Sequence, residues 1–147
     1  MIFKNAAVFL ENRFVTCDVA VEDGRIAAIG DDLGDGMDCA GLKLLPGLVD
    51  IHTHGCAGYD FDHATEVQLA EMSACYLRHG VTAVLATLMT NPRALLLDAA
   101  ARCGNAKAPI RGIYLEGPFF GPAKKGAHDA QHLSPIDGDF FSALDEA

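Results

Sequence analysis

Two stretches decide the fold of this chain: Pro46-Gly-Leu-Val-Asp-Ile-His-Thr-His-Gly55 and Ile113-Tyr-Leu-Glu-Gly-Pro-Phe-Phe120. Each is an apolar run that ends in side chains able to bind a metal, His52 and His54 in the first and Glu116 in the second. Parallel strands present such ends at one rim of a sheet, and active sites of (β/α)8 barrels lie on that rim. The pattern therefore favours a metal-dependent hydrolase.

The two histidines stand at positions i and i+2, where a strand passes into a loop. Side chains alternate along a strand, so His52 and His54 point the same way and can converge on one ion, at ~2.0–2.1 Å if the ion is zinc. Two ordinary loop histidines are the alternative. Asp50 shares the side of His52, and we expect it to support the site rather than bind the ion.

Glu116 ends its strand with the same polarity as the histidine pair. A carboxylate at the end of a buried strand is costly unless it is paired or bound to a metal, so we predict that Glu116 is a ligand. His128 follows twelve residues later in the loop Lys124-Lys-Gly-Ala-His128, and we predict that it contacts substrate. The lysine pair can attract an anion, although two solvated lysines are the simpler interpretation. Phe119 and Phe120 are expected to pack this loop against the sheet.

The first 46 residues are expected to form a small β module. Asp23-Gly24 is a strong hairpin turn, and the acidic, glycine-rich stretch from Gly30 to Gly36 is typical of a loop. Short strands do not close a core alone, so this module needs partner strands. The predicted strands are Ala7–Leu10, Phe14–Val21, Ile26–Ile29 and Leu42–Leu45.

From residue 47 to residue 147 the pattern changes to alternating strands and helices. The strands recur at about 30 residues, the length of a βαβ unit, and predict a parallel sheet. Three βα units are too few for a barrel, which takes eight, so the chain is expected to be the N-terminal part of a (β/α)8 TIM-type barrel. The predicted strands are Leu48–His52, Val81–Leu88 and Ile110–Glu116. The helices are predicted from an N-cap at Thr65 to Leu77, and from an N-cap at Asn91 before Pro92 to Cys103, with a last helix starting after Pro135.

Composition narrows the classes of function. A net charge of −9 argues against a nucleic-acid partner, because phosphate backbones need clustered lysine and arginine. The apolar stretch from Val81 to Met89 is too short to cross a membrane, and the N-terminus lacks signal-peptide features, so a cytoplasmic location is expected. Five cysteines, an odd number without a C-x-x-C pair, indicate reduced thiols. Cys56 lies just after the histidine pair, so a reactive thiol or a metal ligand is the alternative to a simple packing role for this residue.

These motifs resemble the amidohydrolase superfamily and, within it, the N-acetylglucosamine-6-phosphate deacetylase family. The stretch Pro46–Gly55 is shared by many amidohydrolases, whereas Leu115-Glu-Gly-Pro-Phe-Phe120 and Lys125-Gly-Ala-His128 at this separation are more specific to the deacetylases. The resemblance covers essentially the whole chain but only the first part of the family's length. It implies that residues 1–46 contribute to a β-sandwich, and that residues 47–147 are the first three βα units of the barrel.

The resemblance also implies the activity: removal of acetate from N-acetylglucosamine 6-phosphate, a small-molecule substrate, in amino-sugar catabolism. Glu116 matches the family's carboxylate metal ligand, and His52 and His54 match a pair that binds a second ion in some members. The cofactor implied is thus one or two divalent ions, with zinc expected. Ala127, through its backbone, and His128 match the loop that contacts the sugar. The later histidine ligands, the general base and the phosphate-binding residues are expected beyond Ala147, and a homodimer is implied for the full-length protein.

Three alternatives remain open at this point. The substrate can be the N-acetylgalactosamine epimer, or the protein can be another amidohydrolase, such as a dihydroorotase-like or nucleobase-deaminating enzyme. A different class of answer is a chain that keeps structure without turnover, because an unactivated amide needs both a metal-activated nucleophile and a general base.

Overall fold

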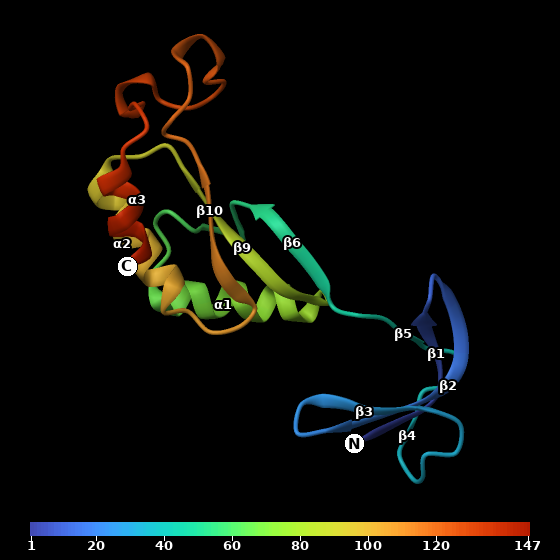
Figure 1. Ribbon diagram of the computed structural model, residues 1–147. Helices are drawn as coiled ribbons and strands as arrows, with labels where there is room; N and C mark the ends of the chain where they lie inside the picture. Colours follow the sequence, from blue (N-terminus) through green and yellow to red (C-terminus); the bar gives the residue numbers. More distant parts are fainter. The chain divides into compact units, whose positions relative to one another are not determined.

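The computed structural model describes residues 1–147, which divide into two compact units, Met1–Pro46 and Gly47–Ala147 (Figure 1). Each unit has its own sheet and its own buried cluster of apolar side chains. The sheet that begins at Leu48 is separate from the sheet of the first unit, as the change in sequence pattern predicts.

The first unit is a five-stranded sheet in the order β3-β2-β1-β4, with β5 also paired to β1. The β2–β3 hairpin turns at Asp23 and Gly24, which both have positive φ, at 49° and 72°. Positive φ at both turn residues matches the twist of the flanking strands. Its strands are β1 (Ile2–Leu10), β2 (Arg13–Glu22), β3 (Arg25–Gly30), β4 (Met37–Asp38) and β5 (Lys43–Leu44).

The first strand is longer than predicted, because β1 begins at Ile2 instead of Ala7. The pairing with β2 is irregular between Phe3 and Ala6, where Asn5 has a φ of 57°, and this irregularity hides the alternation in the sequence. The short strand β4 was not predicted either. It pairs parallel to β1, a long-range contact that local sequence does not encode.

The second unit is an α/β arrangement around a parallel sheet in the order β10-β9-β6. The parallel sheet predicted from the spacing of the strands is therefore confirmed. In Figure 1 the helices lie together on one side of this sheet. Its elements are β6 (Leu48–Thr53), β7 (Gly55–Cys56), β8 (Tyr59–Asp60), α1 (Glu66–Arg78), β9 (Val81–Met89), α2 (Arg93–Gly104), β10 (Ile110–Glu116), the 3-10 turns η1 (Pro122–Lys124) and η2 (Ala130–His132), and α3 (Gly138–Asp145).

The core of this unit lies between the central strand and the helices. Val84, Ala86 and Leu88 alternate along β9 and are buried against side chains of α1 and α2. Helix α1 starts as predicted: the Thr65 hydroxyl accepts a hydrogen bond from the Gln68 amide, and the Gln68 side chain accepts one from the Thr65 amide. This capping box satisfies two amides that would otherwise lack partners.

Two local predictions in this unit are wrong. Asn91 does not cap α2, because Pro92 is the N-cap and the Asn91 amide instead donates to the buried Asp62 carboxylate, at 3.0 Å. The segment Thr53–Ala64, which lies between the predicted strand Leu48–His52 and the predicted helix cap at Thr65 and so has no predicted strand, contains the β7–β8 hairpin, which turns at Ala57 and Gly58 with positive φ. The cap prediction for Asn91 failed because its partner Asp62, a buried carboxylate 29 residues earlier in the chain, is a tertiary contact that the local pattern does not reveal.

Strand β6 differs from the buried strand that its apolar sequence predicts. Leu48, Val49 and Ile51 are 60%, 67% and 60% exposed, since β6 is an edge strand of the three-stranded sheet. None of the helices is long and apolar enough to cross a membrane.

Candidate metal centre

The histidine pair is held at the end of β6 by the residue between its members. The Thr53 amide donates to Thr87 Oγ1 at 2.9 Å, and the Thr53 hydroxyl lies 3.0 Å from the hydroxyl of Tyr76 on α1. Thr53 thus points to the helix-covered side of the sheet. Because side chains alternate along a strand, His52 and His54 point to the opposite side.

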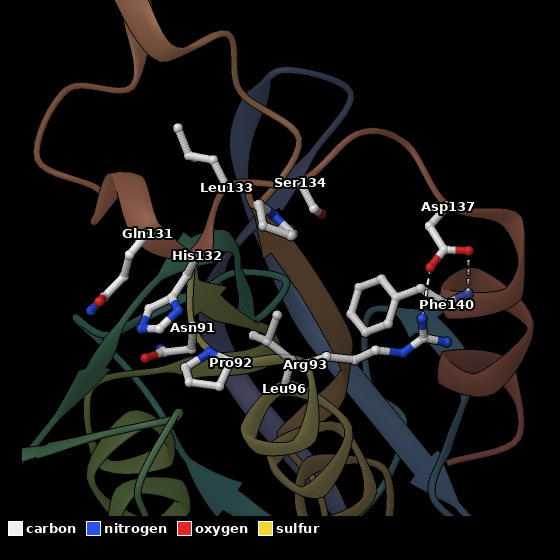
Figure 2. Close-up of a pocket in the computed structure, with 11 residues that line it drawn as sticks. Asn91, Pro92, Arg93, Leu96, Gln131, His132, Leu133, Ser134, Asp137 and Phe140 are labelled. Carbon is white, nitrogen blue, oxygen red and sulfur yellow. Dashed lines mark hydrogen bonds and ion pairs between the residues drawn. The ribbon is translucent and has the colours of Figure 1, made fainter.

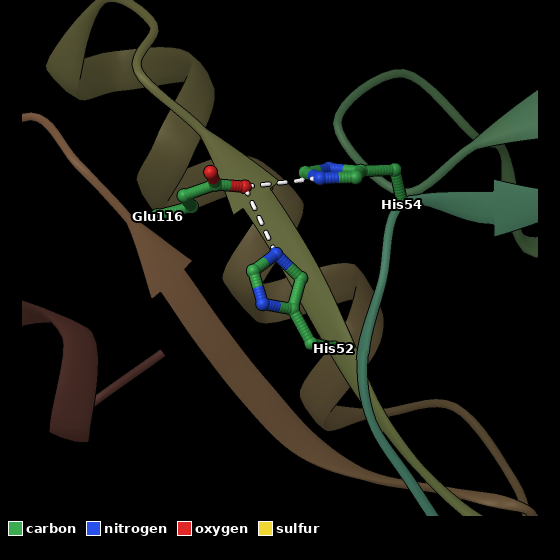
Figure 3. A group of neighbouring side chains, drawn as sticks. All are labelled: His52, His54 and Glu116. Carbon is green, nitrogen blue, oxygen red and sulfur yellow. Dashed lines mark hydrogen bonds and ion pairs between the residues drawn. The ribbon is translucent and has the colours of Figure 1, made fainter. Parts of the chain in front are cut away.

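The three predicted ligands meet at one point. Glu116 Oε2 lies 3.1 Å from His52 Nε2 and 3.0 Å from His54 Nε2, as Figure 3 shows. One ligand atom from each residue lies within 4.8 Å of the others. The convergence expected from the polarity of the strands is therefore observed, although β6 and β10 are not adjacent but flank β9.

The donor set fits a divalent ion. Bonds of 2.0–2.1 Å at tetrahedral angles separate two ligand atoms by roughly 3.3 Å, close to the two nitrogen–oxygen distances here. Two imidazoles and one carboxylate are ligands that zinc accepts, and three protein ligands leave a position for water or substrate. Small side-chain shifts would admit an ion at this point.

The electrostatics of Glu116 favour its ionised form. Partial burial raises the pKa of the carboxyl group, but the hydrogen bond from His52 and the charges of His54 and His52 outweigh it, so the pKa of Glu116 lies below its ordinary value. The His52 ring stacks on Tyr114, with ring centroids 4.7 Å apart, and the His52 amide donates to Asp50 Oδ1 at 3.2 Å. Asp50 therefore contacts the backbone of the pair, as a supporting residue does.

The loop after β10 brings His128 to the same carboxylate. His128 Nε2 lies 3.5 Å from Glu116 Oε1, and His128 Nδ1 lies 2.8 Å from Thr90 Oγ1. The His128 side chain is 7% exposed, while Ala127 beside it is exposed. Their predicted contacts with substrate remain predictions. Lys125 donates to the His128 carbonyl at 2.6 Å, so this lysine holds the loop rather than lying free in solvent.

Sequence reasoning missed Thr90, the polar residue that joins His128 to the end of the central strand. Thr90 directly follows the apolar run of β9, just as Glu116 ends that of β10. The rule that selected Glu116, a polar side chain at the C-terminal end of a strand, could have found it. Cys56, by contrast, lies outside the cluster, with its thiol 3.6 Å from the carbonyl of Met72.

A separate pocket of about 310 Å³ lies between the start of α2 and the loop that leads to α3 (Figure 2). Its two charged side chains, Arg93 and Asp137, pair with each other at 2.6 Å. Asp137 also accepts the amide of Phe140 as the N-cap of α3. None of the residues around this pocket belongs to the histidine–glutamate cluster, so the pocket lies outside the metal centre. Its Arg93–Asp137 pair links the start of α2 to the N-cap of α3.

Comparison with protein families matches residues 44–141, most of the chain, to the one described as Amidohydrolase family. The chain belongs to the amidohydrolase family. The match includes both strands that carry the His52–His54–Glu116 cluster, and metal-competent residues at these strand ends agree with a family of metal-dependent hydrolases.

Relatives within the amidohydrolases point to one group in particular. An N-acetylglucosamine-6-phosphate deacetylase of Vibrio furnissii is 39% identical over 82% of this chain and 32% of its own length. The crystal structure of the deacetylase of that name from Pasteurella multocida superposes with a TM-score of 0.87 and 25% identity, over 99% of this chain and 41% of that one. An allantoinase of Escherichia coli is 56% identical, but over only 37% of this chain. The chain thus spans about a third of the length of the curated deacetylase that it matches.

Proposed function

We propose that this chain is part of an N-acetylglucosamine-6-phosphate deacetylase, a metal-dependent amide hydrolase of amino-sugar catabolism. The observation that carries the proposal is the convergence of His52, His54 and Glu116 at the C-terminal rim of the sheet. The likeness to deacetylases over 82% and 99% of the chain supports the choice within the family. On this proposal residues 47–147 are the first three βα units of a (β/α)8 barrel, and residues 1–46 contribute to a β-sandwich.

The roles of the residues follow from their chemistry. His52, His54 and Glu116 would hold one or two divalent ions, with zinc proposed from the nitrogen and oxygen donors. Such an ion supplies a hydrolytic nucleophile near neutral pH and polarises a carbonyl group. The backbone of the exposed residue Ala127 and the ring of His128 would orient the sugar beside the cluster. Glu116 is the cluster's one carboxylate and is committed to the ion, so we propose that the general base comes from outside residues 1–147.

The experiment measures acetate release from N-acetylglucosamine 6-phosphate by the protein at its full natural length, with and without added zinc. Turnover that a chelator abolishes and zinc restores is the expected result. Glu116→Gln and His54→Asn should remove turnover and bound zinc. His63→Asn is the matched control, because His63 is an exposed histidine that pairs only with Asp60. Failure of the wild-type protein to release acetate contradicts the proposal.

Allantoinase activity is the second candidate, because of the 56% identity over part of the chain. It is less favoured since that similarity covers 37% of the chain, against 82% for the deacetylase. Assays with allantoin and with N-acetylgalactosamine 6-phosphate, run beside the main substrate, distinguish these alternatives. We further propose that the full-length protein is cytoplasmic and that it forms a homodimer. Sedimentation of the full-length protein tests the homodimer.

A further inference from the structure

One hydrogen bond at the rim of the sheet joins Thr90 to His128, 38 residues apart. Thr90 Oγ1 lies 2.8 Å from His128 Nδ1, and the two residues are 6% and 7% exposed. The other ring nitrogen, Nε2, lies 3.5 Å from Glu116 Oε1. The threonine hydroxyl and the glutamate carboxylate thus contact opposite nitrogens of one imidazole ring.

The chemistry of Thr90 and Glu116 decides which ring nitrogen of His128 carries the hydrogen. An ionised carboxylate only accepts hydrogen bonds, so the ring nitrogen that faces Glu116 favours carrying the hydrogen. In a neutral imidazole the other nitrogen is then bare and accepts, which makes the Thr90 hydroxyl the donor to Nδ1. We propose that Thr90 is a positioning residue, which holds His128 with its Nε2–H directed at Glu116 and at an oxygen atom of bound substrate.

The surroundings leave the ring few other orientations. The Phe120 ring lies against it, with centroids 4.6 Å apart, and Lys125 holds its backbone carbonyl. A Cβ on Gly117 would lie 2.0 Å from Thr90 Oγ1, so the glycine leaves the space through which the hydroxyl reaches His128. The Nε2 edge is the part of the ring that faces the cluster.

The consequence for catalysis rests on the proposed function. An Nε2–H donor beside the metal ligands suits a carbonyl or hydroxyl oxygen, and an N-acetylated sugar offers both. A ring rotated by 180° would present a C–H group and lose this contact. Thr90 therefore acts on turnover through His128, without touching substrate itself.

The kinetic test is a double-mutant cycle in the full-length protein. Thr90→Val should lower kcat/KM about tenfold, the scale of one net hydrogen bond, with bound zinc unchanged. Thr90→Ser, which keeps the hydroxyl, should restore most of that loss, and Thr82→Val, at the opposite and exposed end of β9, should have no effect. In a His128→Ala background Thr90→Val should change kcat/KM by less than twofold. An equal loss in both backgrounds overturns the proposal.

A second measurement does not depend on turnover. Long-range ¹⁵N NMR spectra of the ¹⁵N-labelled full-length protein distinguish the two imidazole tautomers, and the His128 signals are assigned by their absence in His128→Ala. We expect the Nε2–H form in the wild type and in Thr90→Ser, and a mixture in Thr90→Val. An Nδ1–H form in the wild type, or no change in Thr90→Val, contradicts the proposal even if the substrate is a different one. If Thr90→Val and Thr90→Ala both fail to fold while Thr90→Ser folds, the hydroxyl serves the fold and the proposal is wrong.

Discussion

Replacement of Gly117 by alanine tests whether the site depends on the close approach of two strand ends. Gly117 has a φ of +93°, and an added Cβ would lie 2.0 Å from Thr90 Oγ1 and 3.1 Å from the ring of Phe120. Thr90 follows a central strand and cannot move away as a whole, so its side chain would have to rotate and leave His128. The strained backbone and the lost hydrogen bond together should cost roughly 2–4 kcal/mol of unfolding free energy.

Gly121→Ala is the matched control. Gly121 has a φ of −66° and no atom within 4 Å of an added Cβ, so its replacement should change stability by less than about 0.5 kcal/mol. The assay is urea unfolding of dilute chain followed by tyrosine fluorescence. The chain has no tryptophan, and all three tyrosines lie in Gly47–Ala147, so the signal reports on the unit that holds the site.

The Thr90 hydroxyl, with which the added Cβ would clash, can be removed separately. In a Thr90→Ala background the clash with the hydroxyl is gone, so Gly117→Ala should cost less, chiefly the backbone strain of ~1–3 kcal/mol, with the contact to the Phe120 ring remaining. The two substitutions should therefore be less harmful together than the sum of their single effects. A Gly117→Ala variant as stable as Gly121→Ala would refute the reasoning, because the strand ends would then adjust without strain.

Three further outcomes are expected. Met72→Ala should cost about 2–5 kcal/mol, since Met72 is fully buried, whereas Val67→Ala at the 69%-exposed Val67 should cost little; urea unfolding measures both. Burial raises the pKa of Asp62 despite hydrogen bonds from Met89 and Asn91, so the folded state binds a proton more tightly than the unfolded state. The free energy of unfolding of the wild type should therefore fall relative to that of Asp62→Asn as the pH rises from about 4 through the raised pKa. Parallel plots of unfolding free energy against pH for the two proteins would contradict this. Finally, residues 1–147 alone should not release acetate with zinc present, because a missing base by itself costs on the order of 10²–10⁴ in rate; turnover like that of the full-length protein would show that the base lies within this chain.

Much of the second unit could be predicted because its signals are local. The apolar run of β10 and the threonine cap of α1 are each contained in a few neighbouring residues, and these elements lie where expected. The strand β4 and the start of β1 were missed, since each depends on pairing with a segment distant in the sequence.

The candidate site divides along the same line. The sequence by itself determined that His52 and His54 share one side of a strand and that Glu116 ends another, because strand periodicity and polarity are local properties. Only the tertiary structure decided that these residues meet across β9, with both histidine nitrogens at 3.0–3.1 Å from one carboxylate oxygen. It also decided that Thr90 reaches His128, a contact between loops that follow different strands. Local patterns fix which way a side chain faces, whereas the packing of whole strands fixes what it meets.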